Sequence, residues 1–96
     1  MALGLKIFRV RDRSMEPFLI DGNFALIRMN PKRVRKGDVV VLEDPRNGRK
    51  IIKRVEKIGE GGDCYVVGDN RQLSSDSRSF GPVPMERIVG KLVLKV

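Results

Sequence analysis

One stretch decides the fold: Lys36-Gly37-Asp38-Val39-Val40-Val41-Leu42, a turn signal followed by four consecutive apolar residues. A short apolar run that follows Gly and Asp is typical of a β-strand buried on both faces. The segment 24–29 has the same pattern after Asp21-Gly22-Asn23. A second strand buried on both faces is therefore expected there.

Four more segments have the character of strands. Residues 88–96 alternate as a half-buried strand does, at the carboxyl end of the chain. Residues 51–58 and 64–67 are expected to form a hairpin, because the glycine-rich loop 59–63 joins them. A further strand is expected around residues 5–10.

Helical signals are sparse. No segment of ten or more residues carries an apolar stripe with a period of 3.6 residues, and only residues 84–87 are expected to form a helical turn, with Pro84 at its first position. Short strands at close spacing predict an all-β, mainly antiparallel barrel or sandwich-like fold with few or no helices. Because 96 residues cannot close two cores, residues 1–96 are expected to form a single domain.

The charge of the chain is uneven. Residues 1–58 carry 15 Lys and Arg against 7 Asp and Glu, whereas residues 59–96 carry 5 of each. A basic face of this kind meets nucleic acid, anionic lipid or an acidic protein, or is simply solvated surface. Nucleic acid is disfavoured as a partner, since four Phe and one Tyr provide no stacking platform spaced along a strand.

The residue types that bind most metals are scarce. The chain has no histidine and one cysteine, Cys64, which excludes an internal disulfide and zinc sites of the usual Cys/His type. No loop has the spacing of an EF-hand, and no metal or cofactor is expected. Cys64 precedes an apolar run and is expected to be a small buried residue.

Hydropathy limits the possible association with membranes. The longest apolar stretches have four residues, against the roughly 20 that span a bilayer, and the apolar run in residues 1–7 is too short for a signal peptide. The chain as given is expected to be soluble, either cytoplasmic or peripheral at a membrane surface. It would be membrane-anchored if it were a piece of a longer protein with an anchor.

Ser14 and Lys53 are the candidates for chemistry. A serine nucleophile needs a base, and in a chain without histidine an amine must take its proton. Strand alternation places Lys53 on one face with Ile51 and Val55, where lost hydration lowers the pKa of the amine. Ser14 precedes a turn at Pro17 and is expected to expose its hydroxyl. The alternatives are a lysine that snorkels at a strand end and a serine that only stabilises a turn.

The polar segment 68–78 follows a predicted strand. An ion pair between Asp76 and Arg78 would fix this loop, and Ser74 would then donate a hydrogen bond that orients the lysine amine. As an alternative, Gly68-Asp69-Asn70 is an ordinary turn and the serines fill a loop.

Five blocks of the sequence, taken together, resemble the type I signal peptidases. In chain order they are Ser14-Met15-x-Pro17, Gly37-Asp38-Val39-Val40, Ile52-Lys53-Arg54-Val55, Gly68-Asp69-Asn70…Ser74-x-Asp76-Ser77-Arg78-x-Phe80-Gly81-Pro82-Val83 and Ile88-Val89-Gly90-Lys91. Each block is modest alone, but the five occur in the order found in that family and run from about residue 10 to residue 91. The resemblance implies the β-fold that signal peptidases share with the peptidase domains of SOS-response repressors.

The resemblance also implies an activity, which is removal of an amino-terminal leader or signal peptide from a precursor polypeptide. Ser14 matches the nucleophile of a Ser/Lys dyad and Lys53 matches its general base. The supporting positions of the family fall on Gly68, Asp69, Asn70, Ser74, Asp76 and Arg78, and its substrate-binding positions fall on Met15 and Pro17. The implied cleavage site is Ala-x-Ala-like, and the Ser14 backbone N–H would be one oxyanion donor.

Two features depart from the pattern of the bacterial enzymes. The position two before the nucleophile, which there carries an oxyanion-binding hydroxyl, is Asp12, and Arg13 replaces a glycine. An ionised carboxylate cannot donate a hydrogen bond, and loss of one oxyanion donor typically costs about 10²–10³ in rate. The membrane helix that usually precedes the serine is also absent from these 96 residues, as in the compact relatives that mature nickel-type superoxide dismutase.

Other functions remain open at this point. A basic β-barrel could bind nucleic acid, and a peptidase relative in which Asp12 blocks catalysis could be a non-catalytic peptide-binding module. A self-cleaving or dimerising domain like those of SOS-response repressors shares Ser-Met and a lysine base, but those domains lack the 68–78 segment.

Overall fold

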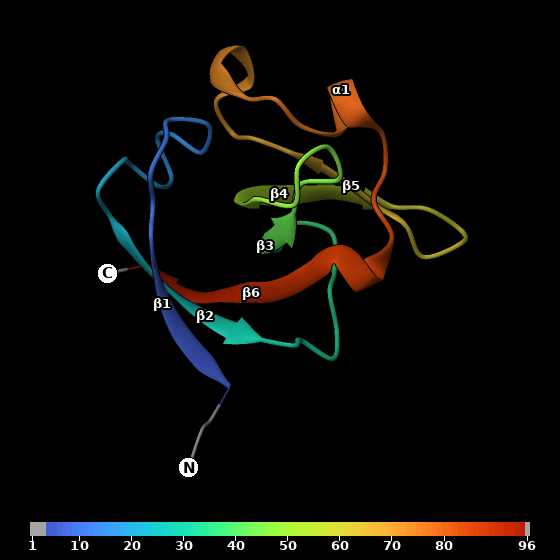
Figure 1. Cartoon of the computed structure of the whole chain (residues 1–96), viewed down its shortest axis with the longest axis horizontal. Coiled ribbons are helices and arrows are strands. Elements are labelled where there is room, and N and C mark those ends of the chain that lie inside the picture. Colours follow the sequence, from blue (N-terminus) through green and yellow to red (C-terminus); the bar gives the residue numbers. More distant parts are fainter. Residues whose placement is uncertain (1–3, 96) are drawn as a thin grey trace.

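The computed structural model describes residues 4–95, in which six strands form one antiparallel sheet in the order β1-β2-β6-β3-β4-β5 (Figure 1). The strands are β1 (Leu5–Arg9), β2 (Phe24–Met29), β3 (Val39–Glu43), β4 (Lys50–Ile58), β5 (Cys64–Val67) and β6 (Ile88–Lys95). The helical segments are short: η1 (Arg71–Leu73), α1 (Ser77–Phe80) and η2 (Met85–Arg87). The predicted fold class, all-β and mainly antiparallel with few helices, is confirmed.

The strand β3 lies in the middle of the sheet, between β4 and β6. Its residues Val39, Val40, Val41 and Leu42 are all buried, so the prediction of a strand covered on both faces is confirmed. Val40 and Leu42 belong to one apolar cluster, whereas Val39 and Val41 contribute to two others. The strand is thus part of the core on both sides of the sheet.

The strand β2 has the predicted bounds but not the predicted burial. Ala25 and Ile27 are fully buried, whereas Phe24 is 47% exposed and Arg28 also faces solvent. The strand β2, between β1 and β6, alternates between buried side chains and more exposed ones, so one of its faces is open to solvent. The prediction of burial on both faces is wrong, because an apolar run does not specify how many faces of its strand are covered.

The remaining predicted elements occur close to their expected places. The hairpin of β4 and β5 closes through the 59–63 loop, where the Gly59 N–H donates to the Asp63 carbonyl at 2.9 Å. Pro84 precedes the helical turn η2 rather than occupying its first position, and Cys64 is fully buried, as expected. Residue 96 of the predicted carboxyl-terminal strand lies outside the described residues.

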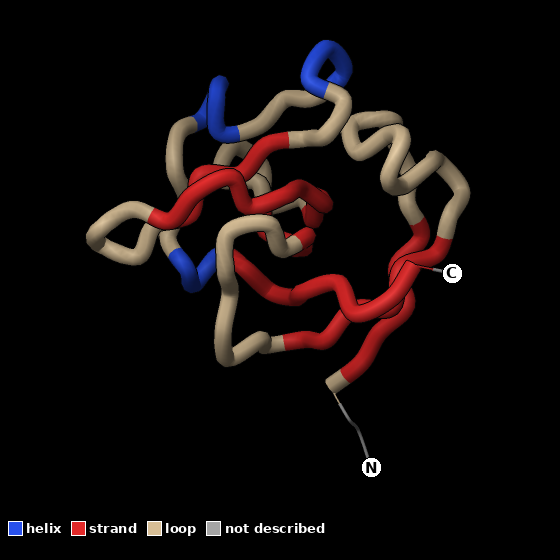
Figure 2. The backbone as a smooth tube through the Cα atoms, turned by 180° about the vertical axis from the view of Figure 1, so that it is seen from behind, coloured by secondary structure: helices blue, strands red, loops and turns tan. Residues whose placement is uncertain are grey.

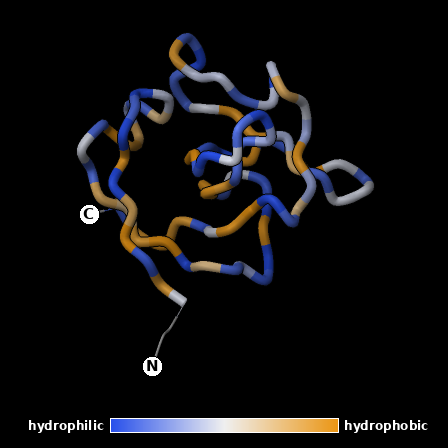
Figure 3. The backbone as a smooth tube through the Cα atoms, in the orientation of Figure 1, coloured by the Kyte–Doolittle hydropathy of each residue, from blue (hydrophilic) through white to orange (hydrophobic). Residues whose placement is uncertain are grey.

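The sheet bends where the register shifts. β6 pairs with both β2 and β3 and shows an irregularity against each of them, which lets the sheet curl. Figure 2 shows the strands around the interior, with the short helical turns at the periphery. Figure 3 shows that hydrophobic residues concentrate on the strands, whereas the loops are largely hydrophilic. Three loops carry the chemistry considered below: 10–23 after β1, 44–49 between β3 and β4, and 68–76 after β5.

Candidate active site

Lys53 is a buried lysine on β4. It pairs with Val40 of β3 and is 3% exposed, and its neighbour two positions on, Val55, is buried on the same face. The predicted apolar environment is therefore present. Burial lowers the pKa of the Lys53 amine, and the nearby carboxylates of Asp12 and Asp76 offset part of this effect.

Ser74 connects this amine to a buried carboxylate. The Lys53 Nζ donates to the Ser74 Oγ at 3.1 Å, and the Ser74 hydroxyl donates to the Asp76 Oδ2 at 2.6 Å. Because a hydroxyl has a single proton, Ser74 accepts from the amine instead of donating to it. The expected direction of this hydrogen bond is therefore wrong, although the expected partners are correct.

Asp76 is the centre of the 68–78 loop and is fully buried. Its carboxylate accepts from the backbone N–H of Gly68 at 2.9 Å and from the Nε of Arg78 at 3.0 Å. Burial raises the pKa of this carboxyl, but the hydrogen bonds from Arg78, Ser74 and Gly68 outweigh burial and hold the pKa far below its usual range. The expected Asp76–Arg78 ion pair is present.

The strand-end motif Gly68-Asp69-Asn70 lies directly against Ser14. The Asn70 N–H donates to the Ser14 carbonyl at 2.8 Å. A Cβ added at Gly68 would lie 2.5 Å from the Ser14 carbonyl oxygen and closer still to the Ser74 Oγ. Only glycine fits between the two serines without displacing one of them. The fold thus brings Ser14, Lys53 and Ser74 into one small region.

Ser14 is 3% exposed, so the expectation of an exposed hydroxyl is wrong. Its carbonyl is held by Asn70, and its Oγ donates to the Oδ1 of Asp12 at 2.9 Å. The Ser14 N–H donates to the same Asp12 oxygen at 3.0 Å. Among the hydrogen bonds of residues 4–95, none joins the Ser14 hydroxyl to the Lys53 amine.

The two predicted substrate contacts lie in different places. Met15 is 1% exposed, packs with Val10, Leu19 and Val39, and its Sδ accepts from the Asp69 N–H at 3.5 Å. Pro17 is exposed and lies beside an open hollow that also involves Asn70. Met15 therefore contributes mainly to the core beneath Ser14, whereas Pro17 is accessible.

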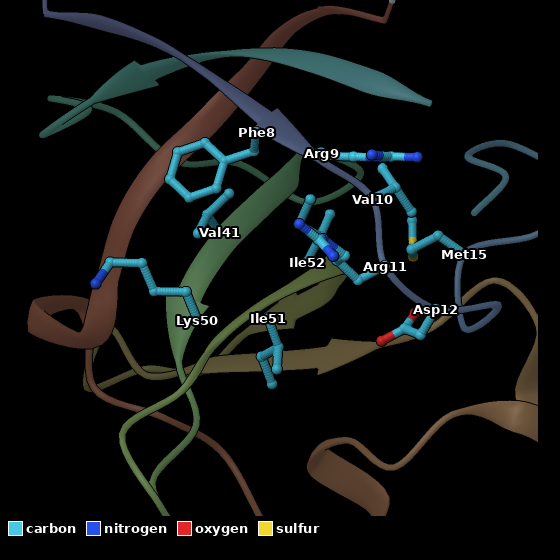
Figure 4. A pocket seen from close by; sticks show the side chains of 10 residues that line it. All are labelled: Phe8, Arg9, Val10, Arg11, Asp12, Met15, Val41, Lys50, Ile51 and Ile52. Atoms are coloured by element: carbon cyan, nitrogen blue, oxygen red, sulfur yellow. The ribbon is translucent and has the colours of Figure 1, made fainter. Parts of the chain in front are cut away.

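Figure 4 shows a small cavity of about 80 Å³, which is lined in part by Asp12 and Met15 of the 10–23 loop. Apolar side chains from β1, β3 and β4 line it, together with three cations and one carboxylate. Its lining consists of Phe8, Arg9, Val10, Arg11, Asp12, Met15, Val41, Lys50, Ile51 and Ile52. Such a cavity suits a small apolar group, and Asp12 contributes to its wall.

Residues that the sequence did not single out also face Lys53. The carboxylate of Asp44, itself buried, binds the Arg46 guanidinium at 2.7 Å, and Arg46 donates to the Ser75 Oγ at 2.7 Å. Burial is the main cause that lowers the Lys53 pKa; Arg46 lowers it further and Asp44 raises it. Asp44 and Arg46 have the sequence pattern of a turn, and no local pattern predicts the hydrogen bond between Arg46 and Ser75, which is 29 positions away.

Arg54, next to Lys53, points away from the amine. Its guanidinium forms two hydrogen bonds with Asp69, at 2.8 and 2.9 Å, and stacks 4.9 Å from the ring centroid of Phe18. It joins β4 to the Gly-Asp-Asn motif and to the 10–23 loop.

In the part of the chain that the structure describes, no group of three or more His, Cys, Asp or Glu residues is arranged to hold a metal ion.

Comparison with known proteins gives a consistent answer. The family model described as "Signal peptidase, peptidase S26" matches residues 2–64 and 56–96. The chain is 35% identical to the mitochondrial ATP-independent inner membrane protease subunit 1b of Arabidopsis thaliana, over 78% of this chain and 59% of the relative. It is 35% identical to the mitochondrial inner membrane protease subunit 2 of Mus musculus, over 82% and 59%, respectively.

Other relatives are matched over smaller parts. The chain is 50% identical to the thylakoidal processing peptidase 1 of Arabidopsis thaliana over 35% of this chain and 10% of that protein. The chain thus spans less than two thirds of the length of these relatives. Among residues 4–95, no helix is long and apolar enough to cross a membrane.

Proposed function

Because the chain belongs to the signal peptidase family, peptidase S26, we propose that it is a serine endopeptidase that removes amino-terminal leaders from precursor polypeptides. Ser14 is the nucleophile and Lys53 is its general base. The observation that carries this proposal is the buried Lys53 amine, whose pKa is lowered by burial and which lies in one hydrogen-bonded cluster with Ser74 and Asp76.

The chemistry is acyl transfer in two steps. The neutral amine of Lys53 takes the proton of the Ser14 hydroxyl, and the Oγ attacks the carbonyl carbon of the scissile peptide bond. The protonated amine then gives this proton to the leaving nitrogen, which releases the carboxyl-side product. Water, deprotonated by the same amine, cleaves the ester and restores Ser14. Since Ser74 accepts one N–H of Lys53, it limits the rotation of the amine and so orients its lone pair.

The cavity lined by Asp12 and Met15, which lie on either side of Ser14 in the chain, supports a substrate with a small apolar residue near the cut. Its volume of about 80 Å³ and its apolar lining suit an Ala-x-Ala-like site. The resemblance of Gly68-Asp69-Asn70 and of residues 76–81 to compact relatives supports the finer proposal that the substrate is a single precursor, such as that of a nickel-type superoxide dismutase. The leader of such a precursor is a second substrate to offer.

A peripheral contact with anionic membrane is part of the same proposal. Ile7, Phe24 and Leu94 are 66%, 47% and 55% exposed, and the sheet register places them on the outward face of β1, β2 and β6. Arg9 lies over the Phe24 ring on this face. Basic and apolar side chains together favour an anionic lipid surface. Sedimentation with anionic vesicles, compared with zwitterionic vesicles, tests this contact.

Mass spectrometry of a leader-bearing polypeptide with an Ala-x-Ala site tests the activity. We expect a single new amino terminus with the unchanged protein and none with the Ser14→Ala variant. Cleavage should increase as the pH rises through the pKa of Lys53, because only the neutral amine accepts a proton. A folded protein that leaves both substrates intact across alkaline pH, with and without detergent, would refute the proposal and favour a non-catalytic peptide-binding module.

A further inference from the structure

Asp12 accepts hydrogen bonds from the two groups of Ser14 that the reaction needs, the backbone N–H and the hydroxyl. A single carboxylate oxygen, Oδ1, accepts both the Ser14 N–H at 3.0 Å and the Ser14 hydroxyl at 2.9 Å. In acyl transfer the nucleophile's N–H would bind the developing oxyanion, and its hydroxyl proton would go to the base. An anionic oxygen of Asp12 now lies where a substrate oxyanion would lie.

This contact is placed so that it can open. Asp12 is exposed to solvent, whereas Ser14 and Lys53 are each 3% exposed. Among residues 4–95, the two hydrogen bonds from Ser14 are the only ones that Asp12 accepts, and it forms no ion pair. A rotation of the Asp12 side chain would therefore free both groups of Ser14 without disturbing the core.

Asp12 also acts on the candidate base. Its charge raises the pKa of Lys53 and so opposes the effect of burial. Lys53 of β4 interacts with the charge of Asp12, and Arg11, the neighbour of Asp12 in the chain, lines the same cavity.

We propose that the Asp12 carboxylate slows the reaction, because in the free enzyme it occupies the position that the substrate oxyanion would take. This inference rests on the proposed function. The substrate carbonyl enters only after the carboxylate has left the Ser14 N–H, and the Ser14 hydroxyl must turn from Asp12 to Lys53 before its proton can be transferred. Asp12 thus competes with the substrate for the same donor.

The inference makes Asp12 a residue whose removal increases activity. Asp12→Ser removes the carboxylate and supplies a hydroxyl that can donate to an oxyanion, so kcat/KM should increase by about 10- to 100-fold, given that one oxyanion donor is worth about 10²–10³. Asp12→Asn retains an oxygen that accepts from the Ser14 N–H but has no charge. Because neutral hydrogen bonds are roughly half as strong as charge-assisted ones, its increase should be smaller.

The experiment compares four variants with the unchanged protein on the Ala-x-Ala leader substrate: Asp12→Ser, Asp12→Asn, Ser14→Ala and, as the control, Asp63→Asn. Asp63 is an exposed acid in the β4–β5 hairpin loop. A second readout does not require activity: the ¹³Cε resonance of Lys53 is followed by NMR as a function of pH. Both Asp12 variants should lower the midpoint of this titration, and Asp63→Asn should leave it unchanged.

The outcomes separate this inference from the proposed function. If the unchanged protein cleaves and the Asp12 variants are equal or slower, the inference is overturned and the proposed function stands. If no protein cleaves, the Asp12 variants included, the proposed function fails and the inference, which rests on it, fails with it; a fall of the Lys53 midpoint would then show only that the charge of Asp12 acts on the amine. If the Asp12 variants cleave faster while the midpoint does not move, the gain comes from the freed N–H and hydroxyl of Ser14, and the inference stands without an effect of Asp12 on Lys53.

Discussion

The two sides of the candidate site are built in opposite ways. On the side of Lys53, the amine, the Ser74 hydroxyl and the Asp76 carboxylate form a connected and largely buried chain of hydrogen bonds. On the side of Ser14, the hydroxyl and the backbone N–H both depend on the exposed carboxylate of Asp12. The proposed base, Lys53, is held in place, whereas the proposed nucleophile, Ser14, is held by a contact that solvent can replace.

The two sides are expected to contribute differently to the free energy of unfolding. Breaking a buried charged network by removing one partner costs about 3–5 kcal/mol. The hydrogen bonds that Asp12 accepts involve a charged group and contribute about 1.5–3 kcal/mol each, but this exposed carboxylate regains water when they break. The side of Lys53 is thus expected to be rigid, with its stabilisation centred on the buried Asp76, and the side of Ser14 to rearrange when substrate arrives. The variants below test this division.

The largest effect is expected for Lys53→Met, which removes the amine but keeps an unbranched side chain. Cleavage should fall by at least about 10²–10⁴-fold, the usual contribution of a general base. Stability should increase instead, because the charged amine is buried at a cost of about 1.4 kcal/mol for each unit by which its pKa is lowered.

The pH dependence of this gain has a definite sign. Since the folded pKa of Lys53 is lower than the unfolded value of about 10.4, the cost is fully present below the folded pKa and disappears as the pH rises from there to the unfolded value. Urea unfolding at several pH values measures it, with Lys57→Met, an exposed lysine of the same strand, as the control. A loss of stability at pH 7 would show that Lys53 is not an energetically costly residue.

The next largest effect is expected for Asp76→Asn. The amide cannot pair with Arg78, and one of the donors around it loses its acceptor, so unfolding free energy at pH 7 should fall by about 3–5 kcal/mol. Because the folded pKa of Asp76 is depressed, its stabilisation is present above the unfolded pKa of about 3.9 and is lost as the pH falls below it. Denaturant unfolding at pH 7 and pH 3 should show the first part of this loss, so the unchanged protein should lose more stability between the two pH values than the variant, which keeps Asp44.

The same variant is a test of the comparison between the two sides. If Asp76→Asn were as stable as the unchanged protein, the side of Lys53 would be no more rigid than the side of Ser14. Asp63→Asn is the control, since Asp63 is exposed in the hairpin loop. It should change the free energy of unfolding by less than about 0.5 kcal/mol at either pH.

Local patterns were sufficient to predict the strands and much of the side of Lys53. Alternation in β4 predicted the buried face of Lys53, and the spacing of two residues predicted the ion pair of Asp76 and Arg78. Both predictions concern residues close in sequence, where backbone geometry decides the contact. The exposed outward face of β2 was missed, because what covers a sheet is set by distant elements.

The side of Ser14 was less predictable for a physical reason. A hydroxyl can rotate, so its partner depends on which acceptors the fold brings near, and a sequence does not give these distances. Asp12 was recognised as a poor oxyanion donor, but not as the acceptor of both Ser14 protons. The contact of Arg46 with Ser75 was missed because it links two loops 29 positions apart.

A smaller effect is expected for Gly68→Ala, which acts on both sides at once. The added methyl group would press on the Ser14 carbonyl and on the Ser74 side chain, and overpacking of this kind typically costs about 1–3 kcal/mol. Gly61→Ala is a matched control, because a Cβ there meets nothing within 4 Å. Thermal unfolding and cleavage rates should both fall for Gly68→Ala alone. Equal behaviour of the two variants would show that the serines have room to separate.

The smallest effects distinguish the two arginine ion pairs that surround the 68–78 loop. Arg54 binds Asp69 through two hydrogen bonds, and these side chains are 31% and 21% exposed. Arg71 binds Glu56 through one hydrogen bond, and these side chains are 57% and 37% exposed.

Arg54→Gln should lower the free energy of unfolding by about 1–2 kcal/mol, since hydrogen bonds to charged groups contribute about 1.5–3 kcal/mol and glutamine keeps part of the packing on Phe18. Arg71→Gln should change it by less than about 0.5 kcal/mol, because exposed pairs are screened by solvent. Urea unfolding at low and at high salt measures both, and salt should weaken the Arg71 pair more. If the two variants were equally destabilised, the connection from β4 to the Gly-Asp-Asn motif would not depend on Arg54, and the rigidity of the side of Lys53 would have to come from Asp76 alone.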